Sequence, residues 1–158
     1  MPDDQRLLIA TDGSCLRNPN GAGGWAWATS PERWRAGAHP STTNNLMELR
    51  AVFEALTATA ADAPLLIESD SLYVIRSVTE WLPTWKRNGW LTSAKKPVAN
   101  QAAIVEIDQL LVGRDVKWRF VKGHNGHVLN EVCDLRARDA ATAIRDGMRV
   151  DTGPGLAR

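Results

Sequence analysis

The order in which strand-like and helix-like segments follow one another restricts the fold of this chain more than any other feature. Short apolar runs at residues 7–11, 23–29 and 32–38 come before any helical pattern and predict three antiparallel strands. Helical and strand patterns alternate along the rest of the chain, which is typical of strands joined by crossover helices. The sequence therefore predicts an α/β fold in which helices cover the faces of a mixed sheet.

The clearest helical pattern lies at residues 42–60. Leu46, Leu49, Phe53 and Leu56 recur there at helical spacing, directly after threonine and asparagine residues that suit an N-terminal cap. The other predicted elements are a strand at 64–69, a helix at 71–82, a helix at 101–113, a strand at 115–121 and a helix at 127–146.

A chain of 158 residues with 44% apolar residues is long enough to bury the core of one domain, which we place at residues 1–146. Residues 147–158 are expected to form a loosely held tail. Cys15 and Cys133 form no CxxC motif, so we expect reduced thiols. The sequence shows no signal peptide and no apolar run near the ~20 residues of a membrane span. We therefore expect a cytoplasmic protein, and its size suggests a monomer.

The positive charge of the chain is concentrated in one segment. The net charge is only +1, but residues 81–100 contain four basic residues and not one acid. Three tryptophans alternate with these cations, as in surfaces that bind nucleic acids. The residues concerned are Trp81, Trp85, Lys86, Arg87, Trp90, Lys95 and Lys96. The alternative is that the tryptophans, above all Trp81 and Trp90, belong to the hydrophobic core.

Two acids follow predicted strands. Asp12 is expected to end the first strand and Asp70 follows the strand at 64–69, and the carboxyl ends of strands in open α/β sheets are where ligands bind. If the two carboxylates converge, their repulsion requires a proton or a cation between them, which points to a divalent metal. The alternatives are an Asx turn at Asp12 and a helix cap at Asp70. Glu68, on the same strand face as Asp70, is expected to lie behind the site or to face solvent.

Two further acids lie on predicted helices. Glu48 shares a helix face with apolar residues, where an unpaired carboxylate is costly, although a capping box with Asn45 would also explain it. Asp134 lies one turn before Arg138, so a surface ion pair explains it as well as a functional role does.

The loop VKGHNGH contains His124 and His127. No other histidine or cysteine lies nearby in the sequence, so a transition-metal site is poorly supported. Proton transfer suits His124 better, and the alternative is a loop histidine without a role. The glycine-rich loop after Asp12 matches neither GxxxxGK[ST] nor GxGxxG, which argues against nucleotide binding.

Several motifs occur along the chain in a fixed order: TDGSC, TTNNLMEL, SDSLYV, the basic tryptophan-rich segment, VKGHNGH and NEVCD. Together they resemble type 1 ribonuclease H, the bacterial family that cuts RNA in RNA/DNA hybrids, over about residues 5–145. The resemblance implies a five-stranded mixed sheet, with three antiparallel and two parallel strands and helices on both faces. It also implies an endonuclease that leaves 5′-phosphate and 3′-hydroxyl ends.

The resemblance assigns roles to particular residues. Four carboxylates, Asp12, Glu48, Asp70 and Asp134, would hold two Mg²⁺ ions, with Mn²⁺ as a possible substitute. His124 matches the histidine of the family's flexible loop. The family's contacts to the RNA strand match Cys15, Asn18, Asn44 and Asn45. Its DNA-phosphate pocket matches Thr43 and Asn100. Residues 81–100 match its DNA-binding handle, with contacts at Trp81, Trp85, Lys86, Arg87, Lys95 and Lys96.

Other classes of protein explain less of the sequence. A non-catalytic module that binds hybrids has no reason to keep Glu48 on an apolar helix face. A glycosidase also uses paired carboxylates, but it leaves the basic segment at 81–100 unexplained. A relative on the same fold that resolves or integrates DNA would use similar acids, whereas TTNN together with DGSC points to recognition of ribose.

Overall fold

The computed structural model describes residues 1–123 and 125–156, and these residues form one mixed sheet. Its strands are β1 (Leu7–Cys15), β2 (Gly23–Ser30), β3 (Arg33–His39), β4 (Leu65–Ser69) and β5 (Val116–Phe120). The strand order is β3-β2-β1-β4-β5, with β1 to β3 antiparallel and β4 and β5 parallel to β1. The predicted five-stranded sheet is therefore confirmed, including the division into three antiparallel and two parallel strands.

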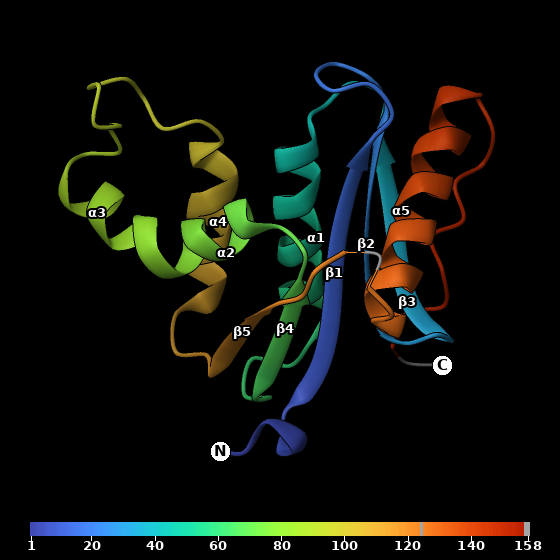
Figure 1. The fold of residues 1–158 in the computed structure, drawn as a ribbon, viewed down its shortest axis with the longest axis horizontal. Helices are drawn as coiled ribbons and strands as arrows, with labels where there is room; N and C mark the ends of the chain where they lie inside the picture. The colour runs from blue at the N-terminus through green and yellow to red at the C-terminus, as the bar shows by residue number, and fades with distance from the viewer. Residues whose placement is uncertain (124, 157–158) are drawn as a thin grey trace.

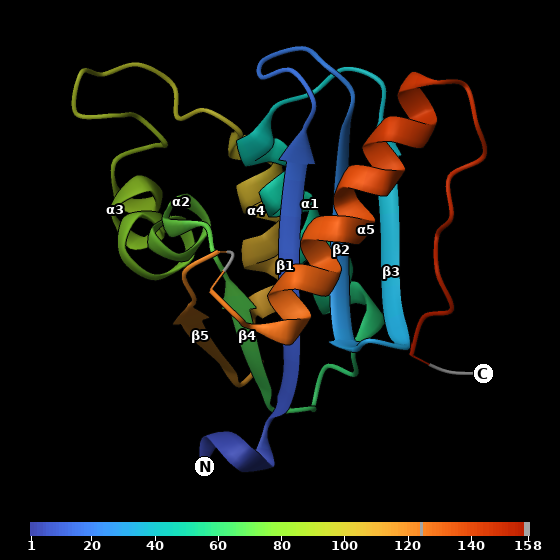
Figure 2. The ribbon, with the colours of Figure 1, turned by 45° about the vertical axis from the view of Figure 1, so that its right-hand side comes forward.

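Helices cover both faces of the sheet (Figures 1 and 2). The helical elements are η1 (Asp3–Gln5), α1 (Asn44–Ala58), α2 (Leu72–Arg76), η2 (Ser77–Trp81), α3 (Leu82–Arg87), α4 (Gln101–Leu111) and α5 (Val128–Arg145). In Figure 2, α5 crosses in front of β1 and β2, while α1 and α4 lie behind the sheet. No helix in the described part of the chain is long and apolar enough to cross a membrane.

The alternation of side chains along the strands divides the core into two clusters. Ile9 of β1 is buried against α1, whereas the next residue, Ala10, is buried in the cluster beneath α5. The α5 side consists mainly of alanines around Cys133 and Trp34, so α5 packs close to the sheet. The central strand β1 is thus packed on both faces of the sheet, with larger side chains on the α1 side and mainly alanines on the α5 side.

The first strand extends further than its apolar run predicts. We expected it to end at Asp12, but β1 continues to Cys15 because residues 10–15 pair with β2. The parallel ladder with β4, in contrast, ends at the pair of Thr11 and Ser69. Asp12 and Asp70 are therefore the first residues beyond this ladder, and this position, rather than a strand end, brings them together.

The helix predicted at 71–82 also extends further. The helical path continues from α2 through the π-type turn of η2 into α3 and ends at Arg87. Pro83 lies in the first turn of α3, where its missing N–H is tolerated, and the wider turn of η2 precedes it. The helical path therefore continues past residue 82, where we expected the helix to stop, because Pro83 is tolerated in the first turn of α3.

The C-terminal segment runs along the free edge of β3 (Figure 2). The Ala36 N–H donates to Thr152 O at 3.1 Å and the Gly155 N–H donates to Trp34 O at 3.0 Å. Val150 packs against the core cluster beneath α5 and Leu156 packs against the cluster on the α1 side. The expectation of a loosely held tail is therefore wrong for this segment, which spans both core layers and covers the edge of the sheet.

Candidate active site

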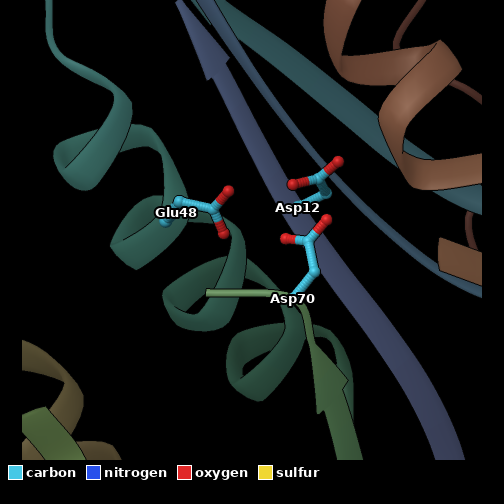
Figure 3. Close-up of side chains that lie close together, drawn as sticks. All are labelled: Asp12, Glu48 and Asp70. Carbon is cyan, nitrogen blue, oxygen red and sulfur yellow. The ribbon is translucent and has the colours of Figure 1, made fainter. Parts of the chain in front are cut away.

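Three carboxylate side chains converge beside β1 in the described part of the chain (Figure 3). Asp12 comes from β1, Glu48 from α1 and Asp70 from the residue after β4. One oxygen of each lies within 4.8 Å of an oxygen of the other two. The structure thus brings Asp12 and Asp70 together, as predicted, although Asp12 lies within β1 and not at its end, and it adds Glu48 from a different layer of the fold.

Gly13 allows α1 to approach β1 closely enough for this arrangement. A Cβ atom at Gly13 would lie 2.2 Å from the backbone nitrogen of Glu48 and 2.3 Å from the carbonyl carbon of Met47. No side chain fits in that space, so the first turns of α1 rest directly on the backbone of β1. The glycine after the acid in TDGSC was the sequence signal for this contact, and our sequence analysis did not use it.

The helix cap shows that Glu48 is not needed for capping. The Thr43 hydroxyl accepts a hydrogen bond from the Leu46 N–H at 3.2 Å, and α1 begins at Asn44. Asn45 therefore lies inside the helix, and the capping box with Glu48 is wrong. Glu48 is buried, and its Oε2 atom has no hydrogen-bond partner among the described residues.

Burial governs the protonation of this cluster. It is the main reason why the pKa of Asp12 is raised to about 7, and the charges of Asp70 and Asp134 act in the same direction. Burial, followed by the charge of Asp12, also raises the pKa of Glu48 well above its usual range. For Asp12, the interaction with the Glu48 side chain opposes the upward pKa shift in part. The Gly13 N–H, which donates to Asp12 Oδ1 at 2.9 Å, opposes the upward shifts of both pKa values less strongly.

The donor set fits a hard divalent cation. Carboxylate oxygens suit Mg²⁺ or Mn²⁺, and a cation would compensate both the raised pKa values and the unpartnered oxygen of Glu48. Asp70 is available for this role, because Ser71 caps α2 by accepting a hydrogen bond from the Val74 N–H at 3.1 Å. The alternative role of Asp70 as the helix cap is therefore wrong.

Asp134 lies on α5 outside the close group of three. It lines the same surface hollow as the other acids, and its charge contributes to the raised pKa of Asp12. Its Oδ2 atom also forms an ion pair with Arg138 Nη2 at 2.9 Å. Asp134 thus forms the surface ion pair and also lies where a functional role is possible, because the ion pair leaves its side chain at the wall of the hollow.

Residues from the β1–β2 loop and the start of α1 form another part of the hollow. Cys15, Asn44 and Asn45 line it, together with Ser14 and Ser71, which the sequence analysis did not single out. Asn18 Oδ1 accepts a hydrogen bond from the Asn44 N–H at 3.2 Å, so it braces the start of α1. Three of the four predicted RNA-side residues thus line the same hollow as the acids, and the fourth, Asn18, is hydrogen-bonded to one of them.

The predicted phosphate-pocket residues occupy two helix starts. Thr43 is the N-cap of α1, and Asn100 immediately precedes α4 with a left-handed backbone (φ 60°). The Asn100 side chain donates a hydrogen bond to the Tyr73 hydroxyl at 3.1 Å. Neither residue lines the acidic hollow.

The basic segment at 81–100 projects from one side of the molecule (Figure 1). The rings of Trp81 and Trp85 lie 5.7 Å apart and those of Trp85 and Trp90 lie 6.1 Å apart. All three tryptophans are half-buried, and Trp85 and Trp90 pack against the core. The core interpretation is therefore correct in part, because this aromatic row anchors the segment to the body of the protein.

The cations of this segment divide into two groups. Arg87, Lys95 and Lys96 are exposed. Lys86 is exposed as well, but it pairs with Asp108 of α4 at 3.1 Å, so part of its charge is already compensated. The exposed positive charge is consequently centred on Arg87 and the loop that follows α3.

His124, to which the sequence analysis assigned proton transfer, lies outside the described residues. Glu68 does not face solvent: it is buried, and Oε2 accepts hydrogen bonds from Nε of Arg119 at 2.9 Å and from Nη2 of the same residue. Glu68 does not line the hollow, so this ion pair between β4 and β5 has a structural role in the strand that ends just before Asp70.

The fold and the acidic cluster together define a metal-dependent nuclease. The RNase H family model matches residues 4–142, and the chain belongs to the ribonuclease H family. It is 44% identical over 153 residues to the ribonuclease H of Tropheryma whipplei (strain Twist), covering 96% of this chain and 94% of that protein.

Solved structures agree with this assignment. LC9-RNase H1, described as a type 1 RNase H with the type 2 active-site motif, has a TM-score of 0.75 and 30% identity, covering 94% of this chain and 76% of that one. The foamy viral protease-reverse transcriptase in complex with an RNA/DNA hybrid has a TM-score of 0.75 and 27% identity, covering 89% of this chain and 21% of that one.

Proposed function

We propose that this chain is an endonuclease that hydrolyses the RNA strand of RNA/DNA hybrids and leaves 5′-phosphate and 3′-hydroxyl ends. The observation that carries the proposal is the group of Asp12, Glu48 and Asp70, whose oxygens lie within 4.8 Å of one another although two of the three side chains are buried. Family membership and the foamy viral relative seen with a hybrid support the choice of substrate.

The proposed cofactor is a pair of Mg²⁺ ions, for which Mn²⁺ could substitute. Asp12, Glu48 and Asp70 would hold one ion, and Asp12 with Asp134 would hold the other. When bound, the ions would stabilise the charge that develops as the phosphodiester bond is hydrolysed. The protein itself supplies fixed, desolvated oxygens, because Asp12 is held in the sheet and Glu48 is packed against Gly13. We assign to His124 the transfer of a proton or the release of product.

Recognition of ribose is proposed for the polar wall beside the acids. An RNA/DNA hybrid presents a wide, shallow minor groove with 2′-hydroxyl groups on one strand only. Cys15, Asn44 and Asn45 line the hollow, and Asn18 holds the start of α1 in place. Short polar side chains and backbone groups at this wall would test for the 2′-hydroxyl, while Thr43 and Asn100 would bind phosphates of the DNA strand.

Cleavage of matched duplexes tests the proposed activity. We expect Mg²⁺-dependent cutting of the RNA strand in a labelled RNA/DNA hybrid, no cutting of RNA/RNA or DNA/DNA duplexes of the same sequence, and no cutting in EDTA. The ends of the products can be identified by comparison with alkaline and enzymatic ladders. A protein that binds the hybrid but leaves it intact with both Mg²⁺ and Mn²⁺ would instead be a non-catalytic binding module. Sedimentation of the free protein and the complex tests the proposed monomer.

The exposed cations after α3 are proposed to bind the DNA strand away from the acids. Replacing Lys95 and Lys96 together with Ala should raise the Michaelis constant for the hybrid and leave kcat unchanged. Each lost phosphate contact should also reduce the slope of log KM against log salt by about 1. The matched control is Lys117→Ala, because this lysine pairs with Asp3. An unchanged salt dependence in the double variant would show that this segment does not bind the DNA strand.

A further inference from the structure

Gly123 lies directly against the carboxylate of Asp70. The β4–β5 pairing continues past the end of β5, since the Val121 N–H donates to Ser69 O at 3.0 Å. Two residues later, a Cβ atom at position 123 would lie 2.8 Å from Asp70 Oδ2, and its three nearest neighbours would all be side-chain atoms of Asp70. The Asp70 carboxylate thus occupies the space that a side chain at position 123 would need.

The backbone that carries Asp70 is held on both sides. The preceding residue, Ser69, pairs with Thr11 of β1 and with Phe120 of β5. Because this backbone is held, Asp70 can make room for a methyl group at position 123 only by rotating its side chain. Rotation of a short side chain costs little energy, but it moves the carboxylate oxygens. Position 123 consequently affects the geometry of the acidic cluster without affecting the core.

We propose that Gly123 is a positioning residue for Asp70: its missing side chain leaves Asp70 free to point at Asp12 and Glu48, and any larger residue displaces the carboxylate from the cluster. This inference rests on the proposed metal centre and assigns to it a residue that is itself no ligand. Changes to groups that orient metal ligands typically reduce metal affinity or activity 10–100-fold, and we expect about 10-fold for a single methyl group.

The test is calorimetric titration of Gly123→Ala with Mn²⁺ in the absence of nucleic acid. We expect Mn²⁺ to bind about 10-fold more weakly than to the wild-type protein. The thermal unfolding temperature in EDTA should be unchanged, because only the end of one side chain has to move. In cleavage assays, kcat should decrease and recover partly at higher Mn²⁺ concentration, whereas KM for the hybrid should stay constant.

Gly126→Ala is the matched control in the same loop. Gly126 has a φ of +80°, so alanine strains the backbone there, but in the described part of the chain no atom lies within 4 Å of the added Cβ. We expect Mn²⁺ affinity in this variant to equal that of the wild type. Equal weakening in both variants would attribute the effect to loop strain and overturn the inference.

Two further outcomes separate the inference from the proposed function. Unchanged Mn²⁺ affinity in Gly123→Ala would overturn the inference and leave the nuclease assignment intact. If the wild-type protein binds Mn²⁺ more tightly than Gly123→Ala but cuts no hybrid, the inference holds and the proposed substrate is wrong. A wild-type protein that takes up no Mn²⁺ would overturn the inference together with the metal centre.

Discussion

Replacing Asp12 with Asn should reduce the rate of hybrid cleavage on the order of 10³-fold or more. Asp12 is the acid that both proposed ions would share, and its carboxylate lies beside those of Glu48 and Asp70 (Figure 3). Asparagine keeps the shape of the side chain but removes its charge, so the fold and its pairing with β2 should be retained. Single-turnover cleavage at saturating enzyme concentration measures this effect without interference from product release.

Asp146→Asn is the control for the loss of one carboxylate. Asp146 is exposed after the end of α5, pairs with its neighbour Arg145 at 2.8 Å and does not line the acidic hollow. Cleavage by this variant should match that of the wild type. If Asp12→Asn retained more than about a tenth of the wild-type rate, Asp12 would not have the central role assigned to it.

The stability of the metal-free protein should decrease as the pH rises from about 4 to about 7. The pKa of Asp12 is raised from 3.8 to about 7 in the folded state. In this range the folded protein therefore holds a proton that the unfolded chain has lost, so its stability falls as the pH rises, and Glu48 acts in the same direction. Above about pH 7, where Asp12 is ionised in both states, its contribution levels off.

Thermal unfolding in EDTA at about pH 5 and about pH 8 measures this effect, which we expect to be on the order of a few kcal/mol. Mg²⁺ should restore stability at the higher pH, because the ion binds only the ionised carboxylates of the folded protein. Asp12→Asn should be more stable than the wild type in EDTA at the higher pH and should show a smaller pH dependence. If the stability of the two proteins changed with pH in the same way, the raised pKa assigned to the buried Asp12 carboxylate would be wrong.

The sequence was sufficient to predict the sheet because its local patterns are unambiguous. Three strand patterns before any helix favour a meander, and the later alternation is typical of crossovers, while the division into three antiparallel and two parallel strands came from the family resemblance. The extension of β1 to Cys15 was not predictable from an apolar run, because its last residues are held by pairing with β2. The segment containing Thr152 and Gly155 was misjudged for a similar reason, since its order depends on hydrogen bonds to β3.

The acidic cluster could be predicted in part. Asp12 and Asp70 were expected to meet because both follow predicted strands, and Glu48 was singled out because it lies on an apolar helix face. The contacts of Gly13 and Gly123 depend on how closely separate elements approach, which spacing along the chain does not encode. The row of Trp81, Trp85 and Trp90 likewise combines core and surface roles that composition alone cannot separate.

The most direct test of the central claim compares the wild type with Asp70→Asn on one labelled RNA/DNA hybrid, in Mg²⁺ and in EDTA. The acidic cluster described here predicts that the wild type cuts only the RNA strand and only with Mg²⁺, and that Asp70→Asn binds the hybrid but leaves it intact. Metal-independent cutting, or undiminished cutting by Asp70→Asn, would show that the reaction does not take place at this cluster.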